Sequence, residues 1–323
     1  MRWFLFAFLT TIAWGIADLF YKKGADESDK YSHLKTSIMV GLVMGIHAIY
    51  TLITKDLNYN FMNVLVYLPV SLMYILSMVI GYFGLRYLEL SISSPVQNSS
   101  GAVVSLMCLI FLGDTLINDS LANIHPWLPL LPLVGVLLIC IGVIALGVVE
   151  KKESDKLTEN GDRKYKIGFI AFMMPILYCI IDAMGTFFDA YYLDDIASTP
   201  LLNVTEATFE DVANVSYELT FLICAIILFV LLMFKKQTMA PKLQGNRLAA
   251  AIFETAGQFC YVHVIGGNAV VAAPMIAAYC VVSMILSRIF LKEKLNLAQY
   301  ITIFIVIAGI ILLGISDGLA GEI

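Results

Sequence analysis

The chain has 323 residues, of which 60% are hydrophobic and only 14% are charged, and its formal net charge is −5. Soluble domains are about one quarter charged, so this chain has too little polar surface to cover a globule in water, and most of its exterior must face lipid. No basic stripe indicates a nucleic-acid partner.

Ten apolar stretches are long enough to cross a bilayer as helices, because a hydrocarbon core of about 30 Å takes roughly 20 helical residues. They cover residues 2–21, 33–54, 63–87, 91–113, 127–149, 166–192, 214–234, 247–265, 268–291 and 297–316. The first stretch has no small-residue cleavage site, so we expect a retained helix and not a signal peptide. Continuous apolar runs argue against the alternating pattern of a membrane barrel.

The polar segment 150–165 separates the fifth stretch from the sixth and is predicted to be a cytoplasmic linker between residues 1–149 and 166–323. These two parts repeat each other, which is the first feature to seek in a sequence. Residues 95–116 align with 274–295 at one ungapped shift, 274 − 95 = 179, which also aligns Tyr82 with Tyr261. Because each half has an odd number of spans, we expect an all-α integral membrane protein whose ten transmembrane helices form two inverted five-helix repeats.

Basic residues predict the orientation in the membrane. Counted by alternation, the side with the first, third, fifth, seventh and ninth loops holds 18 of the 20 lysines and arginines, and the other side holds Arg2 and Lys55. The positive-inside rule therefore places the linker in the cytoplasm and both termini outside, in a multi-pass protein of the cell membrane.

Several motifs in the two halves match a known family. Pro95 and Pro274 open the repeated blocks, FLGD (residues 111–114) and FLKE (residues 290–293) close them, and a glycine-rich span follows each. Together with Trp14-Gly15 in the first span, these features resemble the EamA-type repeat of the drug/metabolite transporter superfamily over nearly the whole chain. Asp114 stands where that family usually has glutamate. The resemblance implies a ten-helix transporter of small metabolites, such as amino acids, amines or sugars, but it does not identify the solute.

Acidic residues inside the spans are the best candidates for function, because a charged group at mid-helix costs roughly 2.5–3.5 kcal/mol on insertion scales. Asp18 and Asp182 align between the halves at a shift of 164 (182 − 18) and would bind a solute amine or carry a coupling proton. Alternatively, each is hydrated near the interface or pairs with a cation such as Lys22. Glu254 and Gln258 share a helix face and would line a cavity, or would form a buried hydrogen bond between helices.

Further polar and aromatic side chains extend this candidate site. Gln97 and Asn98 are too large to act only as close-packing residues, so at least one should line the cavity, whereas Tyr279 is the only hydroxyl in the matching region of the second half. Trp14 lies one turn before Asp18, where a ring and a carboxylate could hold a cation, although packing is the commoner role. Tyr82, Tyr261 and Tyr178 could also contact a solute, but we expect a packing role for them by default.

Two other features have competing structural explanations. Pro95 and Pro274 would provide hinges for a gate, or would occupy the tolerated first turn of a helix. Glu218 is expected near the outer surface with a structural role, and Gly41 and Gly45 are expected to permit close helix packing.

The leading function is secondary-active transport by alternating access, with a small solute, the lipid bilayer and protons as partners. The competing functions are a multidrug or cation exporter and a non-transporting membrane sensor or scaffold. No Walker A or HExxH motif occurs, the six cysteines lie singly in apolar runs, and His47 and His263 are isolated in the sequence. We therefore expect no enzyme activity, no cofactor and no metal. The oligomeric state stays open, a homodimer included.

Overall fold

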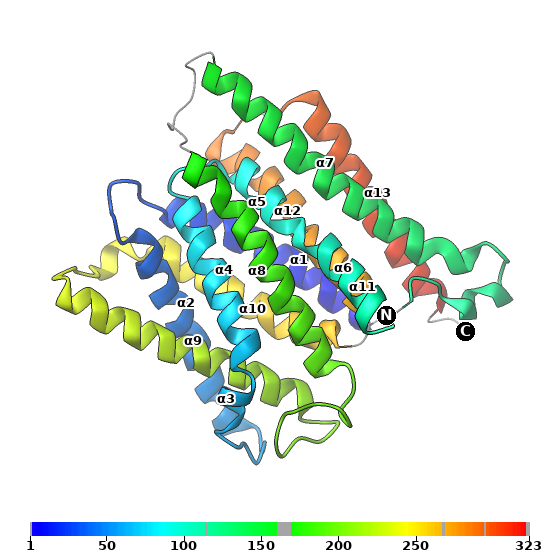
Figure 1. The fold of residues 1–323 in the computed structure, drawn as a ribbon, viewed down its shortest axis with the longest axis horizontal. Helices are drawn as coiled ribbons and strands as arrows, with labels where there is room; N and C mark the ends of the chain where they lie inside the picture. The colour runs from blue at the N-terminus through cyan, green and yellow to red at the C-terminus, as the bar shows by residue number, and fades with distance from the viewer. Residues whose placement is uncertain (1, 114, 160–168, 267–268, 294, 321–323) are drawn as a thin grey trace.

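The computed structural model describes residues 2–320 apart from 114, 160–168, 267–268 and 294, and the described part contains helices and no strands (Figure 1). The helices are α1 (Arg2–Gly24), α2 (Ser32–Thr54), α3 (Asn63–Val66), α4 (Leu68–Gly84), α5 (Leu90–Asn98), α6 (Ser100–Phe111), η1 (Asp119–Asn123), η2 (Leu128–Leu130), α7 (Leu131–Glu159), α8 (Phe169–Leu193), α9 (Phe209–Phe234), η3 (Pro241–Leu243), α10 (Gly245–Ile265), α11 (Ala269–Ala277), α12 (Tyr279–Leu286), η4 (Ser287–Leu291) and α13 (Leu297–Ala320). The all-helical class is confirmed.

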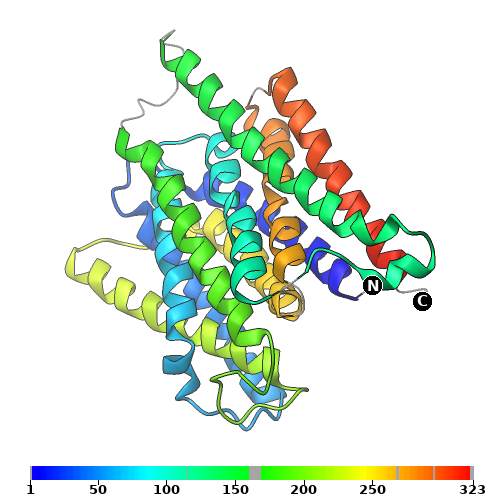
Figure 2. The same ribbon diagram turned by 45° about the vertical axis from the view of Figure 1, so that its right-hand side comes forward.

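Among the described residues, eight helical segments are long and apolar enough to cross a membrane. They correspond to eight of the ten expected spans. The expected span 63–87 is the short helix α3 followed by the 17-residue helix α4, and the expected span 91–113 is divided into α5 and α6. The chain is therefore a multi-pass membrane protein, and the first and last described helices bring the two termini to the same end of the molecule (Figures 1 and 2).

The segment expected as a linker, 150–165, begins as helix. Helix α7 continues to Glu159, because the polar run after the apolar stretch is rich in Glu and Lys, which are good helix formers. The remainder of the segment lies outside the described residues, as does Asp114.

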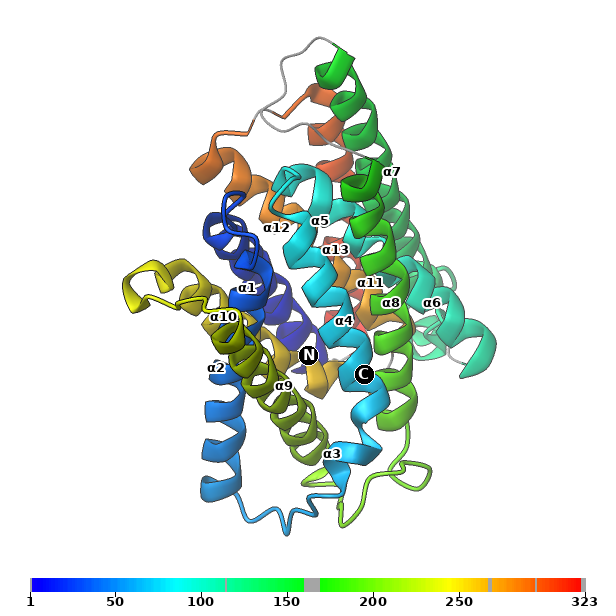
Figure 3. The same cartoon turned by 60° about the vertical axis from the view of Figure 1, so that its left-hand side comes forward.

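Most helices of the first half pack against a helix of the second half. Helix α1 packs against α10, α2 against α9, α4 against α8, α5 against α12, α6 against α11, and α7 against α13. Figure 2 shows α7 and α13 side by side at one edge, and Figure 3 shows α1 next to α10 and α4 next to α8. The interior between these pairs is where polar groups from both halves meet.

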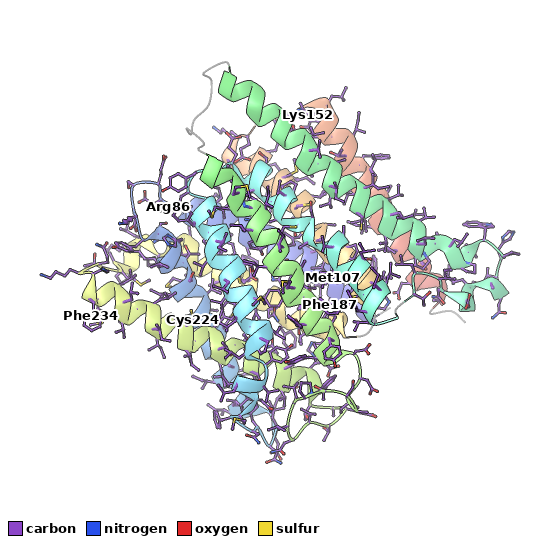
Figure 4. All side chains as sticks on the ribbon, viewed as in Figure 1. Arg86, Met107, Lys152, Phe187, Cys224 and Phe234 are labelled. Carbon is purple, nitrogen blue, oxygen red and sulfur yellow. The ribbon has the colours of Figure 1, made fainter. Side chains whose placement is uncertain are left out.

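Small residues allow these helices to approach closely, as is usual in membranes, where close packing replaces the hydrophobic effect between helices. A Cβ atom on Gly41 would lie 2.3 Å from the Phe221 carbonyl oxygen, and one on Gly45 would lie 2.6 Å from a Leu222 methyl group. The expected packing role of this glycine pair is confirmed. The outward faces are apolar; Phe234, at the end of α9, is 83% exposed (Figure 4).

Both prolines lie inside helices and not in a first turn. Pro95 is the sixth residue of α5 and Pro274 is the sixth residue of α11. Four residues after each proline the helix is interrupted, at Ser99 and at Ala278, where the backbone N–H reaches the proline carbonyl at 3.2 Å. Proline lacks the N–H that would bond to the carbonyl four residues before it, so these interruptions, which follow each proline, are not the direct result of that missing bond. A hinge role at these positions stays a prediction.

Candidate functional site

A polar cavity lies among the paired helices. Its volume is about 60 Å³, and a second cavity of about 30 Å³ shares part of its wall. The first is lined by Trp14, Asp18, Tyr21, Tyr74, Met78, Gly81, Tyr82, Leu85, Gln97, Tyr178, Asp182, Thr186, Tyr217, Glu254, Gln258 and Tyr279. Seven of the eight side chains predicted for the solute or coupling site are in this set, and the eighth, Asn98, lines the second cavity. The structure therefore brings the predicted residues together; whether they bind a solute stays a prediction.

Asp18 is held by two serine hydroxyls from helices far apart in sequence. Ser94 on α5 donates to Asp18 Oδ2 at 2.6 Å, and Ser283 on α12 donates to the same oxygen at 2.7 Å. The carboxyl group is buried, with 9% of the residue exposed, so it is not hydrated at the interface. Lys22, one turn later, donates to the Leu85 backbone carbonyl at 2.7 Å.

Asp182 lies on α8 and borders both cavities. Ser100, the first residue of α6, donates to Asp182 Oδ2 at 2.7 Å. Asp18 and Asp182 thus use the same device: a serine from the kinked fourth segment, α5–α6, donates to each of them. Hydroxyl donors satisfy a buried carboxyl group without cancelling its charge, so the carboxyl group can still attract a cation.

Glu254 joins α10 to α1. Tyr21 donates to Glu254 Oε2 at 3.2 Å, and the indole N–H of Trp14 donates to the Glu254 backbone carbonyl at 3.2 Å. Gln258, one turn later on α10, lines the same cavity. The amide nitrogen of Gln97 is buried and has no hydrogen-bond partner among the described residues, so it offers a donor at the cavity wall.

Aromatic rings form much of the remaining wall. The Trp14 ring centroid lies 5.2 Å from that of Tyr261 and 5.8 Å from that of Tyr279. The lining residues of both cavities include three carboxyl groups and no lysine, arginine or histidine. Carboxyl groups beside aromatic faces form a setting that suits a positively charged group.

Several lining residues were not chosen from the sequence. Tyr21, Tyr74, Thr186 and Tyr217 were missed, whereas Tyr82 and Tyr178 were read by default as packing residues and instead line the cavity. A usable signal was present on α8, where Tyr178, Asp182, Thr186 and Asp189 follow at i, i+4, i+8 and i+11 and therefore share one face.

Glu218 was expected near the outer surface, but its side chain is buried. It is 0% exposed, and its carboxylate lies 2.8 Å from Nδ1 of His47 on α2, so neither residue is isolated. Helix α2 packs against α9, and this packing brings His47 and Glu218 together. The sequence alone did not predict that the two residues are neighbours.

Two sets of hydrogen bonds join separate segments at the end with the predicted cytoplasmic loops. Arg86 donates to the backbone carbonyls of Asp26, Glu27 and Lys30 at 3.0–3.1 Å. Glu293, from the FLKE motif, accepts the backbone N–H of Ser91 at 3.1 Å and also that of Leu90, so it caps the start of α5. A carboxylate at a helix N-terminus is stabilised by the helix dipole.

A polar cavity that contains several acidic groups, inside a multi-pass helical protein, is typical of solute transporters. The model of the EamA-like transporter family matches residues 217–315, from within α9 to within α13. The match confirms, for this part of the chain, the resemblance to EamA-type transporters of the drug/metabolite transporter superfamily seen in the motifs.

One solved structure, whose title reads only "Crystal structure of protein", is similar to this chain. The likeness covers 96% of each chain with a TM-score of 0.60 and 12% identity, and it concerns the fold alone. None of the curated proteins compared matches this chain.

Proposed function

We propose that this protein is a secondary-active transporter that moves a small amine-bearing solute, cationic or zwitterionic, through the central cavity by alternating access. The proposal includes ten membrane-crossing segments arranged as two inverted repeats, residues 1–149 and 166–323. In such transporters the solute lies near the midplane between the repeats, and their relative movement exposes it to one side at a time.

The pattern of helix pairs supports the two-repeat arrangement. If the ten segments are numbered along the chain, the strongest pairs are first with eighth, third with sixth, second with seventh, fourth with ninth, and fifth with tenth. Exchanging the two halves turns the first of these pairs into the second and leaves the other three unchanged. A pseudo-two-fold axis between repeats requires this pattern.

The acidic residues that line the cavity are the observation that supports an amine-bearing solute. Asp18, Asp182 and Glu254 come from three helices, α1, α8 and α10, and the same cavity has no basic lining residue. Three carboxyl groups within one closed space repel each other when ionised, and either a bound ammonium group or protons relieve that repulsion. In both cases the cavity favours a cation, either a solute amine or a coupling proton, over an anionic solute.

The small volume bears on the alternative of a multidrug exporter. The cavity offers about 60 Å³ to the centre of a water-sized sphere, which is room for roughly four to six water molecules at about 10–15 Å³ each. A small solute therefore requires less widening than a drug-sized one.

A thermal-shift screen on detergent-purified protein tests the proposal. The probes are L-lysine, choline and ethanolamine, with glucose and acetate as uncharged and anionic comparators. Because a ligand at 100 times its Kd stabilises by about 2.7 kcal/mol, at least one amine should raise the Tm, and glucose and acetate should not. The Asp182→Asn variant should lose the shift.

Asp194→Asn is the matched control, because Asp194 is exposed just beyond the end of α8. It should respond to amines as the unmodified protein does. Stabilisation by acetate or glucose, with none by the amines, would show that the carboxyl groups do not select the solute.

A further inference from the structure

A chain of hydroxyl groups covers the side of the cavity away from the basic loops. The Tyr74 hydroxyl lies 2.7 Å from the Tyr261 hydroxyl and 2.8 Å from Thr186 Oγ1. Tyr67, between α3 and α4, donates its hydroxyl to Asp189 Oδ1. These contacts join α4, α8 and α10, and we call Tyr67, Tyr74, Thr186, Asp189 and Tyr261 the hydroxyl layer.

Asp189 is the acidic group of this layer, and it has no role in the proposed function. It is 1% exposed, it is not among the cavity-lining residues, and its Oδ2 atom has no hydrogen-bond partner among the described residues. The titratable groups that face it are Tyr67, Tyr74, Tyr217, Tyr261 and, less than two turns away on α8, Asp182. None of these groups carries a positive charge that would balance a carboxylate.

We propose that the hydroxyl layer is the outer gate of the transporter, and that Asp189 is the group whose protonation holds this gate closed. The evidence for this role is the buried Asp189 Oδ2 atom, which has no hydrogen-bond partner among the described residues. An ionised carboxylate without a donor on one oxygen is costly in a buried site, whereas a protonated carboxyl group accepts at Oδ1 from Tyr67 and carries its proton on Oδ2.

The proton exchanges with water on the outer side. When the gate opens, water reaches Asp189, the O–H bond at Oδ2 breaks, and the proton leaves to that water while the carboxylate becomes hydrated. When a proton from outside returns to Oδ2, the neutral group can be buried again and the hydroxyl layer re-forms. Closing the outer side thus takes up one proton and opening it releases one to the same side, so the pH outside sets the position of the gate.

This inference rests on the proposed function, but its test needs no solute. A single cysteine is placed at Met78→Cys, in a background in which the six native cysteines are replaced. Met78 lines the cavity one turn from Tyr74. A membrane-impermeant cationic thiol reagent is added to the outside of oriented vesicles at about pH 5 and about pH 8, and labelling is followed by mass spectrometry.

With Asp189 present, labelling of Met78→Cys should be about tenfold faster at the higher pH, after correction by an exposed reference cysteine at Ser198→Cys. With Asp189→Asn, which is neutral at every pH, labelling should be slow and should lose this pH dependence. Asp194→Asn should keep it. Tyr67→Phe removes the donor to Oδ1 and should speed labelling at the lower pH.

Size-exclusion profiles and Tm values confirm that each variant is folded before labelling. The inference is overturned if Asp189→Asn keeps the pH dependence, or if labelling is independent of pH with Asp189 in place. If Asp189→Asn fails to fold, Tyr67→Phe decides, because unchanged labelling at the lower pH contradicts a gate. Failure of the thermal-shift screen would leave these results unaffected, so the two proposals fail separately.

Discussion

At the residue scale, the buried carboxyl groups of the cavity are held by hydroxyl donors. Asp18 depends on Ser94 and Ser283, and the two hydroxyls come from segments that reach it across the two halves. Ser283→Ala should therefore lower the free energy of unfolding by about 1–3 kcal/mol, because it leaves a buried acceptor with one donor fewer. The fall in Tm in detergent measures this effect.

Ser287→Ala is the control, since Ser287 is equally buried, lies one turn later, and donates only to the Met284 carbonyl of its own helical segment. Combining Ser283→Ala with Asp18→Asn should cost less than the sum of the two changes, because the pair shares one interaction. Equal losses for Ser283→Ala and Ser287→Ala would show that the serine does not act through Asp18.

Sequence reasoning at this scale found acidic groups and missed their partners. Asp18 and Asp182 were predictable, because a carboxyl group in an apolar span is conspicuous and the repeat aligns the two. Tyr21 and the Glu218–His47 pair were not, because the contact depends on which helices pack together. Asp189 could have been found from its place on the Asp182 face of α8.

At the element scale, pairs of helices are held by close backbone approach. Gly41→Ala should lower the free energy of unfolding by about 1–3 kcal/mol, because its Cβ would lie 2.3 Å from the backbone oxygen of Phe221, which cannot rotate away. The Tm in detergent is the measurement. Gly245→Ala is the control, since no atom lies within 4 Å of its added Cβ. If both variants behave alike, α2 and α9 are not held by this contact.

The spans themselves were largely predictable from apolar length, which the bilayer thickness sets. Their interruptions were not. The breaks at Ser99 and Ala278 follow prolines that the sequence also allowed at a first turn, and the run of α7 to Glu159 follows from helix propensity beyond the apolar stretch. Neither the helix breaks nor the extension of α7 changes the hydropathy of the segment, so a hydropathy pattern cannot locate them.

At the scale of the whole molecule, the internal repetition predicts ten spans in two inverted repeats, and this arrangement stays a prediction. The shift of 179 residues predicted two related halves, and the helices of one half pack mainly against those of the other. The solute could not be predicted, because the cavity wall is assembled from seven helices that are far apart in the sequence. Charge was the one property of the wall that the sequence already indicated.

We propose that a solute crosses the membrane through the cavity around Asp182. The most direct measurement is uptake of radiolabelled L-lysine, choline and ethanolamine by proteoliposomes under an imposed proton gradient. For at least one probe, uptake should exceed that of protein-free liposomes about tenfold or more, Asp194→Asn should keep it, and Asp182→Asn should reduce it to near the protein-free level. Uptake no faster than in protein-free liposomes for all three probes, or full gradient-driven uptake by Asp182→Asn, would contradict the account.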